Sequence, residues 1–396
     1  MNLESIKSNY KIKKYIKTDW VEKLQQSSIL PEFTQKNLFL PKLNNSVISL
    51  LEKKFKTSDL KELDRLTVLE HSHLDELVNC KKIISSIECG VKQDIMSKVY
   101  GNDFIPLQVI QWIEMKGLEC SVIKFLNINL IVVNDQPISN ILLKHIIRII
   151  SWMLRIKGDM SIPISIYIFL SPEKKHMESQ CLNFNFNSHT CHLSRTNINS
   201  GASWGGNWIQ LFRSEEILKV LIHELAHYLV LDVQRYSNNI DSYCSHLKMG
   251  SESKEILVNE AYAELIAIYL HTMYVCYFKT NFNNFDPELF WDLYLTEEKF
   301  TICQINKIFV NYSIESIQYF AKPNKFIQHT NVISYFIIKY LFFINTKFFL
   351  LIYESKSQTV KLIKYLLARF FKLRIPQVKL DSNINTSLAM SFHSII

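Results

Sequence analysis

The sequence has no long apolar run free of polar and charged residues, and its start lacks the apolar stretch of a signal peptide. Residues 332–353 are strongly apolar, but Lys339, Asn345 and Lys347 interrupt them. A helix that crosses a bilayer needs roughly 20 predominantly apolar residues, so we expect buried helices here and no membrane span. The opening MNLESIKSNYKIKK is polar and basic, which predicts an intracellular protein.

Clustered cysteines and blocks of one charge are also missing. The 8 cysteines are dispersed, which indicates reduced thiols inside the cell. The net charge of +8 is spread along the chain without a basic block interleaved with aromatics, so we predict a solvated surface and no specific nucleic-acid partner. His189, Cys191 and His192 are ligand-type residues, but no second pair follows at zinc-finger spacing. A second zinc site is therefore not expected.

Apolar residues are plentiful, and their spacing divides the chain into three regions. They make up 48% of the 396 residues, enough for a substantial buried core. Helical spacing dominates residues 1–101 and returns in residues 281–396, whereas residues 102–280 mix strand and helix patterns. We expect an α+β protein with an N-terminal helical region, a central domain of strands and helices, and a C-terminal helical domain.

The middle region is expected to alternate short strands with helices. The predicted elements are a hairpin over 121–135, a helix over 139–156, a strand over 164–170, a strand over 207–212, a helix that begins after Ser214, and a helix over 255–278. Ser214 is the expected N-cap, with Glu215 and Glu216 in the first helical turn. The polar loop of residues 171–207 separates the two single strands.

The segment Lys219–Leu229, KVLIHELAHYL, contains the pattern His-Glu-x-x-His. Residues four apart share one face of a helix, so His223 and His227 can bring two imidazole nitrogens to one metal ion. Glu224 lies about 100° around the helix, where its carboxylate can act on a metal-bound water without being a ligand. The spacing predicts a catalytic metal site on this helix.

A catalytic zinc site needs a third protein ligand and an open fourth position. Metzincins place a glycine and a histidine at the positions of Val230 and Val233, so that class is excluded. Glu260 and Glu264 stand one turn apart in Val258–Leu270, VNEAYAELIAIYL, and are the better candidates.

Residues 208–270 resemble the gluzincin zinc peptidases, whose second helix carries Asn-Glu-x-x-x-Asp or Glu-x-x-x-Glu. The resemblance implies a zincin-like catalytic domain with one Zn²⁺, held by His223, His227 and Glu260. It also implies that Glu264 is an outer carboxylate that orients a ligating histidine, His223.

A looser resemblance connects the chain with metallopeptidases encoded by large DNA viruses. It rests on the order of five segments: Asn197–Gly201, Ile209–Glu216, Lys219–Glu224, Asn259–Glu264 and Ser334–Leu341. The scarcity of glycine, with 8 residues, and the abundance of Ile, Asn, Lys, Phe and Tyr are also typical of an AT-rich genome. For a viral protein, the expected location is the host cytoplasm or the virion.

The predicted reaction is peptide-bond hydrolysis, in which Glu224 removes a proton from a zinc-activated water and passes it to the leaving amine. The substrate is a peptide or protein, expected to pair with an edge strand formed by Trp208, Ile209, Gln210 and Leu211. The oxyanion donor stays open among four candidates: Tyr236, Tyr243, His246 and Tyr262.

Two other readings of the same motif remain. The first is a structural or virion-associated protein that binds zinc without turnover, although an inactive descendant has little need of the base Glu224. The second is a non-peptidase zinc amidohydrolase of the deformylase type, although the Gly-Cys-Leu-Ser motif of that family is missing from the sequence upstream. Peptide turnover separates these readings from the peptidase.

Overall fold

The computed structural model describes the central and C-terminal parts of the chain most fully. The described residues are 52–53, 55–56, 58–69, 81–83, 97, 99, 105–114, 118–175, 193–204, 208–233, 236–246, 256–282, 284–312, 314–321, 330–345, 359–378, 388 and 391. Most of the predicted N-terminal region and the residues 189–192 lie outside them.

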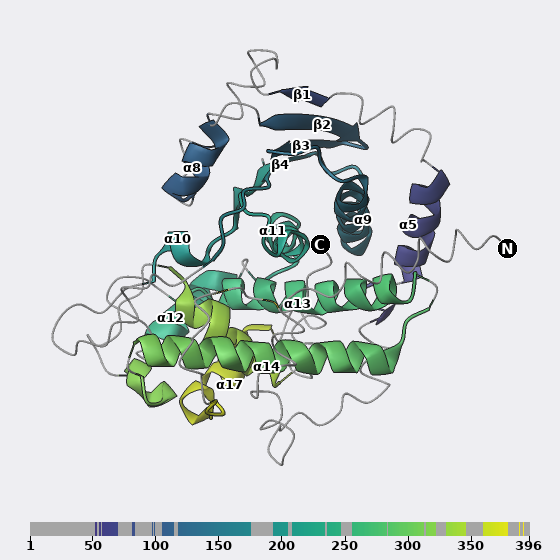
Figure 1. Cartoon of the computed structure of the whole chain (residues 1–396). Coiled ribbons are helices and arrows are strands. Elements are labelled where there is room, and N and C mark those ends of the chain that lie inside the picture. Colours follow the sequence, from purple (N-terminus) through teal and green to yellow (C-terminus); the bar gives the residue numbers. More distant parts are fainter. Residues whose placement is uncertain are drawn as a thin grey trace.

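These residues form an α+β fold in which a mixed sheet is followed by helices (Figure 1). The strands are β1 (Lys81–Ile83), β2 (Glu119–Phe125), β3 (Ile128–Asn134), β4 (Ile164–Phe169), β5 (Gly201–Trp204) and β6 (Trp208–Leu211). They make a 6-stranded sheet in the order β1-β2-β3-β4-β6-β5. The pairs β3–β4 and β4–β6 are parallel, and the other neighbours are antiparallel.

Alternating apolar side chains bury both faces of the central strands. In β3, Leu130 and Val132 join the larger core, whereas Ile131 and Val133 join a second cluster on the opposite face. This follows from the two-residue period of a strand. The second cluster includes residues of α8 (Leu107–Glu114), and the larger core includes α9 (Asn140–Lys157) and α11 (Ile217–Tyr228). The sheet is thus covered by helices on both faces (Figure 1).

Local sequence signals explain the elements that lead to the site. The predicted hairpin is confirmed, since Phe125 pairs with Ile128 across a two-residue turn. The helix predicted over 139–156 is α9, which starts after the N-cap Ser139 and ends at Gly158, where φ is +83°. Glycine suits this left-handed position because it has no Cβ to clash with the backbone.

The helices after the sheet form a layer beneath α11 (Figure 1). Their long members are α13 (Val258–Lys279), predicted over 255–278, and α14 (Pro287–Asn311). The shorter helices after the sheet are α12 (Ser237–His246), η4 (Ile317–Ala321), the π-helix η5 (Ile333–Ile338), α15 (Lys339–Phe343), α17 (Thr359–Leu367) and η6 (Phe370–Lys372). Two other short helices come earlier in the chain: α5 (Ser58–Leu69) precedes β1, and α10 (Arg195–Ile198) precedes β5. Both α11 and α14 pack against α13.

The apolar segment predicted to form buried helices contains η5 and α15, whose residues are all buried. Among the helices of the described residues, none is long and apolar enough to cross a membrane.

The predicted start of the motif helix is wrong by two residues. Glu216, not Ser214, is the N-cap of α11, and its φ of +58° is left-handed. The Ser214 hydroxyl instead donates to the carbonyl of Ser171 at 3.0 Å, and the Glu216 carboxylate accepts from Lys175 Nζ at 2.7 Å. These tertiary contacts hold both residues outside the helix.

Candidate metal centre

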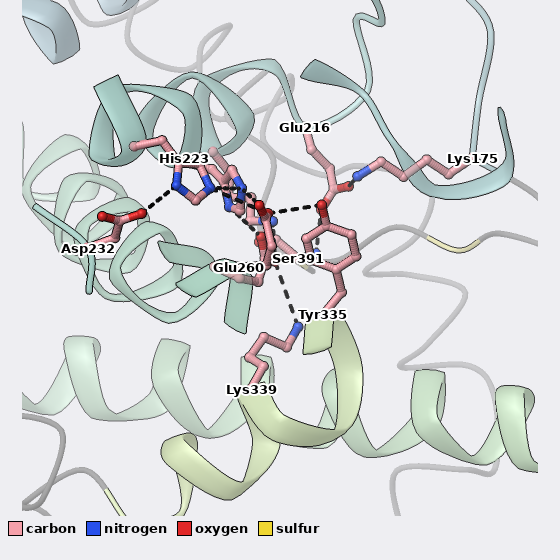
Figure 2. Close-up of polar contacts among 11 residues, drawn as sticks. Lys175, Glu216, His223, Asp232, Glu260, Tyr335, Lys339 and Ser391 are labelled. Atoms are coloured by element: carbon pink, nitrogen blue, oxygen red, sulfur yellow. Dashed lines mark hydrogen bonds and ion pairs between the residues drawn. The ribbon is translucent and has the colours of Figure 1, made fainter. Parts of the chain in front are cut away.

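The side chains of His223, His227 and Glu260 converge between α11 and α13 (Figure 2). His223 and His227 lie one turn apart on α11, and Glu260 lies in the first turn of α13. The two Nε2 atoms are 3.1 Å apart, and Glu260 Oε2 is 3.5 Å from that of His223 and 3.4 Å from that of His227. The helix spacing of the motif therefore produces a single cluster of ligand-type atoms.

These separations fit a metal ion at the centre of the cluster. Tetrahedral ligands at the usual zinc distances of about 2.0–2.1 Å lie about 3.3 Å from one another. The observed values of 3.1, 3.4 and 3.5 Å agree with this geometry. Two imidazoles and a carboxylate are also the donor set typical of catalytic zinc. The His/His/Glu group could thus hold an ion without rearrangement.

Opposite charges face each other within the cluster. Burial lowers the pKa of His227, but Glu260 and Asp232 act more strongly and raise it well above its ordinary value. At Glu260 burial raises the pKa, but the contacts with His227 and His223 outweigh it and hold the pKa well below its ordinary value. A metal cation would take over the positive charge of the imidazolium protons, so binding would release protons.

Glu264 connects His223 with two buried lysines. Glu264 Oε2 lies 3.1 Å from His223 Nδ1, and Lys219 contacts Glu264 Oε1 from the same helix as His223. Lys339 Nζ, from α15, lies 3.8 Å from that oxygen (Figure 2). All three charged groups are almost fully buried, with 1% of each side chain exposed. Burial raises and these cations lower the pKa of Glu264, and the net shift is downward, so Glu264 is ionised.

Asp232 gives His227 a carboxylate partner that sequence reasoning missed. Its Oδ2 lies 2.6 Å from His227 Nδ1, and its side chain is fully buried. The signal in the sequence is weak: one acidic residue, five positions after His227, inside the apolar run LVLDV. Its position depends on the turn that ends α11, which the spacing of the motif does not specify.

Glu224 lies beside the ligand cluster but does not belong to it. It points toward the edge strand β5, because a Cβ added at Gly201 would lie 2.8 Å from Glu224 Oε1. Ser203 of the same strand donates a hydrogen bond to its carboxylate. Burial raises the pKa of Glu224 above its ordinary value. A carboxylate with a raised pKa is a better proton acceptor, which suits a general base.

Tyr335 reaches the cluster from the π-helix η5 (Figure 2). Its hydroxyl donates to Glu260 Oε2 at 3.0 Å, and its ring centroid is 6.2 Å from that of His223. Burial and the charge of Glu260 raise the pKa of Tyr335 well above its ordinary value, so the hydroxyl stays protonated and can donate. π-helical turns are rare and are often found at functional sites.

Three of the four candidate oxyanion donors named from the sequence have described side chains, and their recorded neighbours are other side chains. The Tyr243 ring has Lys364 Nζ at 5.2 Å from its centroid, and the buried Tyr262 packs edge to face on Phe342. Tyr236 immediately precedes α12 and packs against the larger core. The side chain of His246 lies outside the described part of the structure. Tyr335 was not among the four.

The segment expected to pair with the substrate as an edge strand is an interior strand, so the predicted edge position is wrong. β6, which contains Trp208, Ile209, Gln210 and Leu211, pairs with β4 on one side and β5 on the other. Its backbone groups are already used within the sheet. Among the described strands, β5 is the edge of the sheet on this side.

A cavity of about 30 Å³ lies next to Glu224. Its walls include His223, Glu264, Tyr335, Ser200 and Gly201. This space is enough for roughly two water molecules. The His/His/Glu group therefore adjoins a small polar cavity that has room for a reacting water.

Comparisons of the chain with protein families, with curated proteins and with solved structures found no match.

Proposed function

We propose that this chain is a zinc-dependent peptidase in which His223, His227 and Glu260 hold the ion. The observation that carries the proposal is the convergence of these three side chains at zinc-like separations, next to a buried carboxylate that is not a ligand. A zinc ion held there would supply Lewis acidity and lower the pKa of a bound water from 15.7 to roughly 7.

Glu224 is the proposed general base. Its carboxylate adjoins the cavity beside His223, and its raised pKa favours the uptake of a proton from a water there. The same carboxyl group then donates that proton to the nitrogen of the leaving amine. Ser203 orients the carboxylate through its hydrogen bond. Glu224 thus moves one proton from the nucleophile to the leaving group.

Tyr335 is the proposed donor to the oxyanion. Its protonated hydroxyl lies 3.0 Å from Glu260 Oε2, the oxygen that belongs to the His/His/Glu group. From there it can donate to a carbonyl oxygen that gains negative charge near the same point. This role replaces the four candidates chosen from the sequence.

An extended peptide is the proposed substrate, and β5 is the proposed strand that binds it. β5 has one neighbour, β6, and its other edge is not used within the described sheet. A peptide added to this edge would form backbone hydrogen bonds that do not depend on side chains. Because Gly201 and Ser203 of β5 contact Glu224, the peptide would lie beside the proposed base.

The decisive experiment compares the wild type with Glu224→Gln. Zinc content is measured by elemental analysis, and cleavage is measured with a peptide library read by mass spectrometry. We expect one zinc per chain in both proteins and a loss of activity of about 10²–10⁴-fold in the variant, the usual contribution of a general base. Glu288→Gln is the matched control, because Glu288 is exposed at the start of α14.

Each alternative gives a different result. A wild type that binds zinc and cleaves no peptide would indicate a structural zinc protein or a non-peptidase amidohydrolase. Full activity in Glu224→Gln would reject the proposed mechanism. Activity that persists after complete removal of the metal by a chelator would reject the zinc-dependent reaction itself.

A further inference from the structure

We propose that Asp232 is a positioning residue that fixes the orientation and tautomer of His227, and that a strained turn at Val230 brings it there. The inference rests on the proposed metal centre, but it does not require that the centre cleaves peptides. It concerns how the chain prepares one imidazole for a metal ion.

The two nitrogens of His227 face different partners. Nδ1 lies 2.6 Å from Asp232 Oδ2, whereas Nε2 lies 3.1 Å from His223 Nε2 and 3.4 Å from Glu260 Oε2. An ionised carboxylate only accepts hydrogen bonds, so Nδ1 of a neutral imidazole must carry the hydrogen that it donates to Asp232. The lone pair then lies on Nε2, the nitrogen that faces His223 Nε2 and Glu260 Oε2.

The turn after α11 brings Asp232 to this place. Leu231 N donates to the carbonyl of Ala226, and Val230 N donates to that of His227, both at 2.9 Å. These two bonds form a Schellman motif, in which the residue after the helix C-cap is left-handed. On a continued helix, Asp232 would lie about 140° around the axis from His227. The turn reverses the chain and returns Asp232 to the His227 ring.

Val230 is an unusual residue for this position. Its φ is +53°, and its side chain is 41% exposed. A β-branched residue in the left-handed region costs on the order of 1–3 kcal/mol, and glycine is the residue usually found there. Contacts elsewhere must therefore hold the turn in shape.

Contacts with the far end of α9 hold the turn. Lys157 Nζ, in the last turn of α9, donates to the carbonyl of Leu229 at 2.7 Å. Tyr228 OH donates to the carbonyl of Pro163 at 2.6 Å, just before β4. The end of α11 is thus anchored to the connection between α9 and β4.

The two outer carboxylates of the site have different surroundings. Glu264 lies at 3.1 Å from His223 Nδ1 and is also contacted by Lys219 and Lys339. Asp232 makes the shorter contact, 2.6 Å, with its histidine. Because Asp232 contacts the proposed ligand His227, removal of the Asp232 carboxylate should weaken metal binding.

The test measures zinc affinity by competition with a chelator and the coordination geometry from the absorption spectrum of the Co²⁺-substituted protein. Asp232→Ala should weaken zinc binding by about 10–100-fold and change the Co²⁺ spectrum. Asp232→Asn should lose less, because its amide oxygen can still accept from Nδ1. Glu298→Gln is the control for a buried acid, since Glu298 is 1% exposed on α14.

Two variants of Val230 test the turn while Asp232 stays in place. Val230→Gly accepts the positive φ, so zinc affinity should stay within about twofold of wild type. Val230→Pro cannot adopt this φ, and it loses the backbone N–H that donates to the carbonyl of His227. This variant should therefore weaken zinc binding as Asp232→Ala does. Thermal unfolding of the metal-free proteins shows whether each variant is folded, and Asp232→Asn serves in place of an unfolded alanine variant.

The outcomes separate this inference from the proposed peptidase. If Asp232→Ala and Asp232→Asn bind zinc as tightly as wild type and give the same Co²⁺ spectrum, the inference is overturned. If affinity falls as expected while the wild type cleaves no peptide, the inference stands and the peptidase fails. A wild type without affinity for zinc overturns both.

Discussion

At the scale of single residues, Tyr335 and Glu260 show how the site joins distant parts of the chain. Glu260 lies in the first turn of α13, and Tyr335 belongs to η5, which comes after α14 and η4 in the chain. Lys339, one turn after Tyr335, lies 3.8 Å from Glu264, one turn after Glu260. Two helices therefore meet through two matched contacts, and this register places the Tyr335 hydroxyl next to the ligand cluster.

Removal of the Tyr335 hydroxyl should reduce turnover more than binding. In Tyr335→Phe we expect kcat to fall by about 10²–10³-fold, because a donor to the oxyanion acts mainly in the transition state. KM and zinc content should change little, since the ring remains and Tyr335 is not in the His/His/Glu group. Steady-state kinetics with a cleaved library peptide, together with zinc analysis, measures these quantities.

Tyr243→Phe is the matched control for Tyr335→Phe. The Tyr243→Phe variant also loses a tyrosine hydroxyl, and it keeps the ring that lies under Lys364. Its kinetics should equal those of the wild type. A kcat within threefold of wild type in Tyr335→Phe, or an equal loss in both variants, would remove Tyr335 from the proposed mechanism.

The part of the site encoded by local spacing could be predicted from the sequence, and the part made by chain reversal or distant packing could not. His223 and His227 meet because they are one helical turn apart, and Glu264 follows Glu260 by the same rule. Asp232 depends on a left-handed turn at Val230, a residue that rarely adopts one. Tyr335 depends on how η5 docks against α13, a tertiary contact without a periodic signal.

At the scale of elements, the sheet shows the same limit. The hairpin β2–β3, the helix α9 and the strand β4 were predicted from alternation, caps and helical spacing, and they are confirmed. The identity of the edge strand was wrong, because the short β5 in the polar loop was not predicted and it covers β6. Edge status depends on pairing between strands, which the pattern of one strand does not contain.

The close approach of β5 to Glu224 gives a prediction about Gly201. In Gly201→Ala, the new Cβ would lie 2.8 Å from Glu224 Oε1 and 2.9 Å from Leu211 Cδ2, closer than real Cβ contacts. Glu224 or β5 must therefore shift, which changes their relative position, and we expect activity to fall by at least about 10-fold while zinc content is retained. Kinetics and zinc analysis of the variant measure both effects.

Ala202→Ser is the control for this strand. Successive side chains of a strand point to opposite faces, so a side chain at residue 202 points away from the face on which Gly201 meets Glu224. Its activity should stay close to wild type. Unchanged activity in Gly201→Ala would show that the contact between β5 and Glu224 does not position the base.

At the scale of the whole molecule, one large apolar core connects the sheet, the motif helix and the helices that follow. The cluster extends along the chain from Phe55 to Leu388 and includes residues of α9, α11, α13 and α14. The divisions expected near residues 101 and 280 stay predictions. Polar groups near the metal centre also come from distant segments, since Glu216 accepts hydrogen bonds from Lys175 Nζ and from the backbone N–H of Ser391 (Figure 2).

Residues near the end of the chain contribute to this core. Leu388 is fully buried, and its N–H donates to the carbonyl of Lys175 at 3.0 Å. Ser391 donates its hydroxyl to Glu297 Oε1 at 2.6 Å, and its backbone N–H donates to Glu216. These contacts join α14, the residue before α11 and the segment after β4.

A chain that ends at residue 387 should therefore be less stable but still able to bind zinc. The loss of a buried leucine and of hydrogen bonds to two buried carboxylates should lower the free energy of unfolding by about 2–5 kcal/mol. Zinc affinity should change less than in Asp232→Ala, because Leu388 and Ser391 are not part of the His/His/Glu group.

Denaturant unfolding measures the stability of the shortened chain, and chelator competition measures its zinc affinity. A chain that ends at residue 392 is the control, because it keeps Leu388 and Ser391. Equal unfolding midpoints for the chains that end at 387 and 392 would contradict a role for these residues in the core, whereas a lower midpoint only in the shorter chain would support it.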